Sequence, residues 1–127
     1  MTITQYKRLT ITLTIAVILL SALNILFFWR YSWQHIEVAF ASEQTKIFEE
    51  MRVRALESDP VAAAGYLEYA VRYYPSGSKQ RTGSRLDLMV ERERATAVQD
   101  IITYLRVKTG QDLGTNAEKW IERFVRK

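Results

Sequence analysis

The stretch from Leu9 to Trp29, LTITLTIAVILLSALNILFFW, decides the fold of this chain. It contains no charged residue. As an α-helix, this stretch would reach about 31 Å, which matches the hydrocarbon core of a bilayer, roughly 30 Å thick. Only a helix can satisfy its own backbone polar groups in that setting. We therefore predict one transmembrane helix over residues 9–29.

Aromatic and basic side chains border the apolar run on both sides. Tryptophan, tyrosine and snorkelling arginine favour the boundary between lipid and water. The residues that we place at this boundary are Tyr6, Trp29, Arg30, Tyr31 and Trp33. Inside the run, Asn24 is the one strongly polar side chain. We expect it to bond within its own helix, with a bond to a partner helix as the alternative.

The charges that flank the run predict its orientation. Lys7, Arg8 and the amino terminus precede it, whereas only Arg30 follows it closely. Cytoplasmic flanks carry the excess of positive charge, so we expect residues 1–8 in the cytoplasm of a bacterium and the C-terminal part outside the inner membrane. A cleaved signal peptide is the alternative, because Ala39-Phe40-Ala41 has the form of a cleavage site. We favour an anchor, since the apolar region of a signal peptide is only about 7–15 residues long.

Charge and residue types exclude several classes of function. The formal charge of +4 divides into about +2 from residues 1–40 and about +2 from residues 41–127, which gives no support for nucleic-acid binding. Cysteine is absent, so disulfides and thiolate sites are excluded. The single histidine, His35, stands at the membrane boundary without further metal ligands. No nucleotide-binding or hydrolase motif occurs, and we expect no enzyme and no cofactor.

The rest of the chain is predicted to be all-α, because apolar residues recur at helical spacing and no segment alternates like a strand. We expect helices over residues 34–57, continuing from the membrane, and over 60–74, 85–109 and 115–125. The resulting organisation is a cytoplasmic N-terminus (1–8), a transmembrane helix (9–29), a juxtamembrane amphipathic helix (30–57) and a small helical domain (58–127).

Capping residues and apolar faces support these helices. Asp59, Ser84 and Thr115 are the expected N-caps, and Gly110 suits the left-handed position after a helix. Trp120 is expected to be a core residue of the last helix. The polar run Glu91-Arg92-Glu93-Arg94 allows a bend or break in the third helix. The expected inward stripe of the 34–57 helix consists of Ile36, Phe40, Ile47, Phe48, Met51 and Ala55.

Two short stretches resemble known helical repeats. The spacing of Ala63, Leu67, Ala70 and Pro75 is similar to the second helix of a tetratricopeptide repeat, although no second copy follows. The stretch 109–114 with Trp120 resembles the closing turn and helix of bacterial HEAT-like proteins. More broadly, the soluble part resembles membrane-anchored bacterial proteins of planctomycete type. These resemblances imply a helical-hairpin packing scaffold and bring no catalytic residue.

A basic loop, residues 73–85, is the most distinctive surface candidate. Its cations, its tyrosines and the helix N-terminus that follows are suited to an anion or an acidic partner. The candidate binding residues are Arg72, Lys79, Arg81 and Arg85. A solvated loop without a ligand is the simpler interpretation.

The sequence favours a membrane-anchored interaction or scaffold protein, or an accessory subunit of a membrane complex. Its expected partners are the lipid bilayer and another membrane or extracytoplasmic protein. A peripheral domain that binds polyanions or anionic lipid through residues 79–85 is the alternative, and a hydrolase or transferase is the least favoured class. An interaction protein should leave an apolar or aromatic patch exposed once its core is packed.

Overall fold

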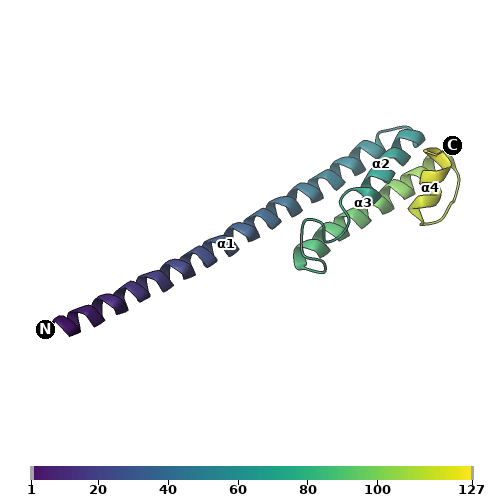
Figure 1. Ribbon diagram of the computed structural model, residues 1–127. Coiled ribbons are helices and arrows are strands. Elements are labelled where there is room, and N and C mark those ends of the chain that lie inside the picture. The colour runs from purple at the N-terminus through teal and green to yellow at the C-terminus, as the bar shows by residue number, and fades with distance from the viewer. Residues whose placement is uncertain (1, 127) are drawn as a thin grey trace. The chain divides into compact units, whose positions relative to one another are not determined.

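The structure is a computed structural model that describes residues 2–126. Within that range the chain forms four helices and no strand, which confirms the all-α prediction (Figure 1). The helices are α1 (Ile3–Leu56), α2 (Pro60–Arg72), α3 (Arg85–Thr109) and α4 (Ala117–Phe124). Helix α1 joins the predicted 9–29 and 34–57 helices without interruption, and α3 has the bounds that its capping residues predict.

Two compact units divide the chain between Ile36 and Glu37. The described part of the first unit consists of the N-terminal part of α1, and the side chains of its apolar run lie exposed. Of the helices in residues 2–126, only α1 is long and apolar enough to cross a membrane. Asn24 donates to the carbonyl oxygen of Leu20 at 3.0 Å, so its amide bonds within its own helix as expected.

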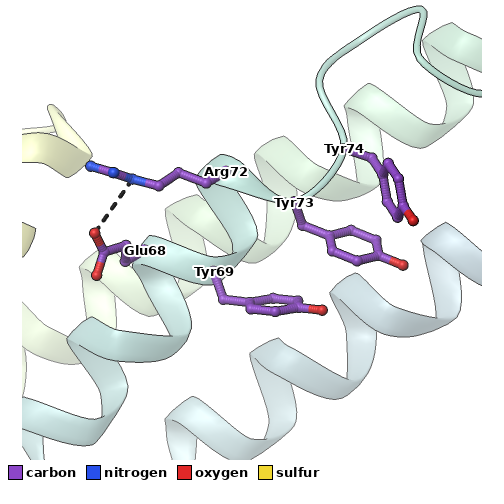
Figure 2. Close-up of a pocket in the computed structure, with 5 residues that line it drawn as sticks. All are labelled: Glu68, Tyr69, Arg72, Tyr73 and Tyr74. Atoms are coloured by element: carbon purple, nitrogen blue, oxygen red, sulfur yellow. Dashed lines mark ion pairs between the residues drawn. The ribbon is translucent and has the colours of Figure 1, made fainter.

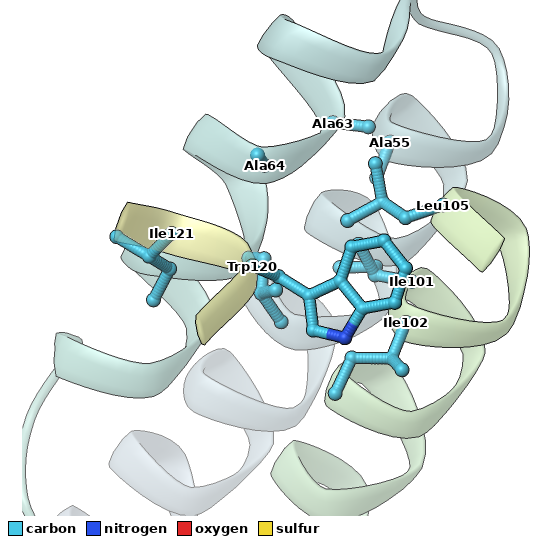
Figure 3. Packing of buried hydrophobic residues seen from close by; sticks show 9 residues of the cluster. Ala55, Ala63, Ala64, Ile101, Ile102, Leu105, Trp120 and Ile121 are labelled. Carbon is cyan, nitrogen blue, oxygen red and sulfur yellow. The ribbon is translucent and has the colours of Figure 1, made fainter. Parts of the chain in front are cut away.

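The second unit has a hydrophobic core in two parts. The part shown in Figure 3 surrounds the fully buried indole of Trp120, which lies beside Ile101, Ile102 and Leu105. The indole N–H donates to the carbonyl oxygen of Gly114 at 3.0 Å. Trp120 is therefore a core residue, as predicted. The other part consists of Ala41, Phe48, Ala70, Val90 and Ala97.

Most capping predictions are confirmed, and one is wrong. Asp59 accepts hydrogen bonds from the backbone of α2, Ser84 caps α3, and Gly110 ends α3 in the left-handed conformation. The N-cap of α4 is Asn116 and not Thr115, because the Asn116 side-chain oxygen accepts from the Glu118 N–H at 3.0 Å. Asparagine is also the stronger N-cap residue of the two.

The inward stripe of α1 also differs from the prediction. The buried α1 side chains are Ala41, Gln44, Phe48 and Ala55, whereas Ile36 and Phe40 are exposed. Gln44 is tolerated inside because it accepts a hydrogen bond at 2.8 Å from Gln80, which is also buried. The predicted stripe did not include Gln44, because its buried partner is 36 residues away in the sequence.

The polar run at residues 91–94 does not break α3. The guanidinium of Arg94 turns inward, where it donates to the carbonyl oxygens of Ala70 (2.7 Å), Val71 (3.3 Å) and Tyr74. It also lies over the Phe48 ring, 4.6 Å from its centroid. Since the last carbonyls of a helix lack partners within that helix, Arg94 acts as a side-chain cap for α2.

Candidate functional site

The basic loop is organised around a buried carboxylate, Asp87. Its oxygens accept from the backbone N–H of Gly77 at 3.0 Å, the N–H of Gly83 at 2.9 Å and the hydroxyl of Ser76 at 2.8 Å. Ser84 closes the arrangement by accepting from the Asp87 N–H at 3.2 Å. Only half of a capping box is therefore formed, because the short Asp87 side chain bonds to Gly83 and not to the Ser84 N–H.

These bonds stabilise the ionised form of Asp87. Its pKa is lowered from the usual value of 3.8, first by the hydrogen bond from Gly83, then by those from Ser76 and Gly77 and by the charge of Arg94, while burial opposes the shift. The loop donors that could bind a phosphate thus already hold an internal anion. This placement weakens the argument for phosphate binding by the loop backbone.

The four basic candidates have different surroundings. Arg72 forms ion pairs with Glu68 at 3.4 Å and with Glu118 at 3.5 Å. The ammonium of Lys79 lies between two rings, 4.7 Å from the Phe40 centroid and 4.9 Å from the Tyr74 centroid. The remaining two candidates, Arg81 and Arg85, are exposed. The structure places Lys79 against aromatic rings and Arg72 against carboxylates. Among the described residues, no hydrogen bond or ion pair connects Lys79 with Arg72.

A row of tyrosines forms the most distinctive hollow on the second unit. Figure 2 shows Tyr69, Tyr73 and Tyr74 side by side, with their hydroxyls pointing away from the ion pair of Glu68 and Arg72. These five residues line an open hollow of about 440 Å³. The rings of Tyr69 and Tyr73 are stacked with centroids 5.1 Å apart, and Tyr74 meets Tyr73 edge-on at 4.6 Å.

The core holds this row in place from beneath. Tyr73 packs edge-on against the buried Phe48 ring, with centroids 5.8 Å apart, and burial raises the pKa of its hydroxyl. Tyr74 has a φ of 37°, an unusual value for a residue with a side chain, and Arg94 binds its carbonyl oxygen. Packing against Phe48 and the bond from Arg94 therefore hold Tyr73 and Tyr74 in place. Tyr69 and Tyr74 remain 46% and 41% exposed.

Sequence reasoning named Tyr73 and Tyr74 within the loop but overlooked Tyr69 and Phe40 as surface residues. The signal for Tyr69 was its four-residue spacing from Tyr73, which places both rings on one helix face. Phe40 had been assigned to the core stripe, whereas here it is the ring beneath Lys79.

The described residues give little basis for chemistry. Between residues 2 and 126, no group of three or more His, Cys, Asp or Glu side chains is placed to hold a metal ion. His35 packs edge-on against Tyr31, with ring centroids 4.3 Å apart. Several carboxylates lie beside arginines, as Glu49 does beside Arg52 at 2.6 Å.

Comparison of the chain with protein-family models, with curated proteins and with solved structures finds no match in any of the three. Functional proposals therefore rest on the geometry of the chain itself.

Proposed function

We propose that this chain is a single-pass membrane-anchored helical interaction protein, a scaffold or accessory subunit of a membrane complex. Its C-terminal unit binds a partner protein through the tyrosine hollow, and its N-terminal helix anchors it in the inner membrane. The observation that carries this proposal is the row of Tyr69, Tyr73 and Tyr74, in which Tyr69 and Tyr74 remain exposed after the core is packed.

The chemistry of the hollow suits a protein partner. Tyrosine is enriched at protein interfaces because it offers a large, rigid apolar area together with a hydroxyl that can bond to a partner. Partner-binding residues also act best when they are held in place before binding. Here Phe48 and Arg94 hold Tyr73 and Tyr74 from below.

Affinity purification of the full-length chain from detergent, with Tyr69→Ala and Val61→Ala compared, tests this site. Both residues lie exposed on α2, and Val61 lies outside the hollow. We expect a reproducible co-purifying protein that Tyr69→Ala removes and Val61→Ala retains. Equal retention by both variants, or no co-purifying protein at all, would contradict the proposed interface.

The anchor is supported by the uncharged 9–29 run, by the exposure of its side chains and by the aromatic residues that border it. We expect the chain to resist carbonate extraction of membranes. A soluble chain with a new N-terminus at Ser42 would instead identify a signal peptide. The proposed orientation predicts that protease added to intact spheroplasts digests residues after Tyr31, and full protection until lysis would reverse it.

A polyanion-binding or lipid-binding domain is the second candidate function, and the exposure of Arg81 and Arg85 favours it. The internal anion Asp87 weighs against binding of a free phosphate in the loop. Arg72, one of the four candidate cations, already pairs with carboxylates of the chain itself. An enzyme is not proposed, because the tyrosine hollow is open and its two charged groups, Glu68 and Arg72, form an ion pair with each other.

A further inference from the structure

The first half of α3 carries two large apolar side chains that are mostly exposed. Leu88 is 62% exposed and Met89 is 55% exposed, although both lie inside a well-capped helix. On the opposite face Asp87, Val90 and Ala97 are buried, so this part of α3 is firmly seated. Leu88 and Met89 therefore do not serve the core of the second unit.

Two arginines share this exposed face. Arg85 lies three and four residues before Leu88 and Met89, and Arg92 lies four and three residues after them, spacings that place all four on one side of a helix. Arg81 in the preceding loop adds a third exposed cation. We define these five residues, Arg81, Arg85, Leu88, Met89 and Arg92, as the α3 face.

The positive charge of the α3 face is not neutralised within the unit. The ion pairs found among the described residues use none of the three guanidinium groups of Arg81, Arg85 and Arg92. Of the acidic neighbours, Asp87 is buried in the loop and Glu91 pairs with Arg94 at 3.2 Å. Apolar side chains between arginines are typical of segments that insert shallowly into an anionic membrane surface.

The stretch of chain between the proposed membrane span and the second unit is short. The loop before α3 contacts α1 through Lys79, over the Phe40 ring, and through Gln80, which bonds to Gln44. Phe40 follows Trp29 by eleven residues, a reach of about 16 Å in a helix. A tether this short keeps the local concentration of lipid headgroups high.

We propose that the α3 face docks on the anionic surface of the bilayer in which the chain is anchored, with Leu88 and Met89 among the headgroups and acyl-chain ends and the arginines on lipid phosphates. This inference rests on the proposed membrane anchor. It adds a second, reversible contact with the same membrane, which holds the second unit in one orientation and so presents the tyrosine hollow in a fixed direction. Each cation near an anionic bilayer raises partitioning about fivefold, so loss of two should weaken docking about 25-fold.

The absence of cysteine allows a direct test with the full-length chain. Leu88→Cys carries an environment-sensitive fluorophore, and the protein is reconstituted into vesicles of phosphatidylcholine and phosphatidylglycerol that contain a lipid-bound quencher. Val107→Cys is the matched control, because Val107 is exposed on the same helix but lies outside the α3 face. We expect the label at 88 to be strongly quenched and the label at 107 to remain in water. Quenching at 88 should fall in phosphatidylcholine alone, and with Arg85→Gln and Arg92→Gln together.

Three results would overturn the docking proposal. The labels at 88 and 107 could be quenched equally, quenching at 88 could be independent of lipid charge and of both arginines, or it could vanish on protein dilution, which would identify a second copy as the occupant. Vesicle flotation after carbonate treatment distinguishes a failure of the docking from a failure of the anchor. A chain that stays with the vesicles while its 88 label remains in water contradicts the docking alone, whereas a chain that leaves the vesicles contradicts the anchor as well.

Discussion

Replacing Asp87 with asparagine should destabilise the second unit by about 2–4 kcal/mol. The native carboxylate accepts from Gly77, Gly83 and Ser76 at 3.0, 2.9 and 2.8 Å. An asparagine retains a single acceptor oxygen and turns an amino group toward at least one of these donors. A hydrogen bond to a charged group contributes about 1.5–3 kcal/mol, and a buried donor without a partner is destabilising by a similar amount.

Asp112→Asn provides a matched control. Asp112 also accepts from a glycine N–H, that of Gly114 at 2.9 Å, and from the Arg106 guanidinium at 3.1 Å. Its side chain is 70% exposed, whereas Asp87 is 3% exposed. Water can replace the lost bonds of Asp112, so its replacement should change the thermal midpoint much less than that of Asp87.

The assay is thermal unfolding of the full-length chain in detergent micelles, together with amide hydrogen exchange. For Asp87→Asn we expect a lowered midpoint and faster exchange at Gly77 and Gly83, because both amides lose an anionic acceptor. Native exchange at these two amides, together with an unchanged midpoint, would refute the view that an internal anion organises the loop. If Asp112→Asn lowered the midpoint as much as Asp87→Asn does, burial of the carboxylate would not determine the size of the stability loss.

Three further predictions concern the same unit. Trp120→Ala should lower stability by about 3–5 kcal/mol, measured by the same unfolding assay, because it empties the centre of the core; an unchanged midpoint would contradict that role. Arg94→Met should lower stability by about 2–3 kcal/mol and speed amide exchange in the last turn of α2, because it removes the side-chain cap; native exchange there would oppose this. The pKa of Asp87 is lower in the folded chain than its usual value of 3.8. The contribution of Asp87 to the free energy of unfolding is therefore complete above pH 3.8 and is lost as pH falls through the folded pKa. An acid titration of wild type and Asp87→Asn should therefore show a stability gap that closes below about pH 4, and a gap that persists in strong acid would contradict the assignment.

The course of the helices could be predicted from the sequence because its signals are local. Ser84 and Gly110 bound α3 at the positions where a capping side chain and a left-handed residue are needed. Asp59-Pro60 starts α2 in the same way. These signals act within one turn of helix, so they do not depend on what the helix packs against.

The direction of the polar side chains could not be predicted because it depends on distant partners. Gln44 faces inward because Gln80 meets it, and Arg94 faces inward because the end of α2 presents unpaired carbonyls. Both partners become neighbours only after the helices have packed. The tyrosine hollow depends in the same way on Phe48 and Arg94, so only the spacing of Tyr69 and Tyr73 was visible beforehand.

The basic loop shows how these long-range contacts change a functional interpretation. Glycines, cations and a helix N-terminus together are typical of a phosphate site, but here Asp87 occupies the backbone donors and a pair of rings holds Lys79. What the loop then contributes is rigidity, since it is fixed from α3 by Asp87 and from α1 by Gln44. A rigid loop keeps Arg81 and Arg85 in place on the surface, where they can act together with the apolar residues of α3. The internal anion thus argues against a ligand within the loop, and at the same time it provides the stable base that a membrane-docking face requires.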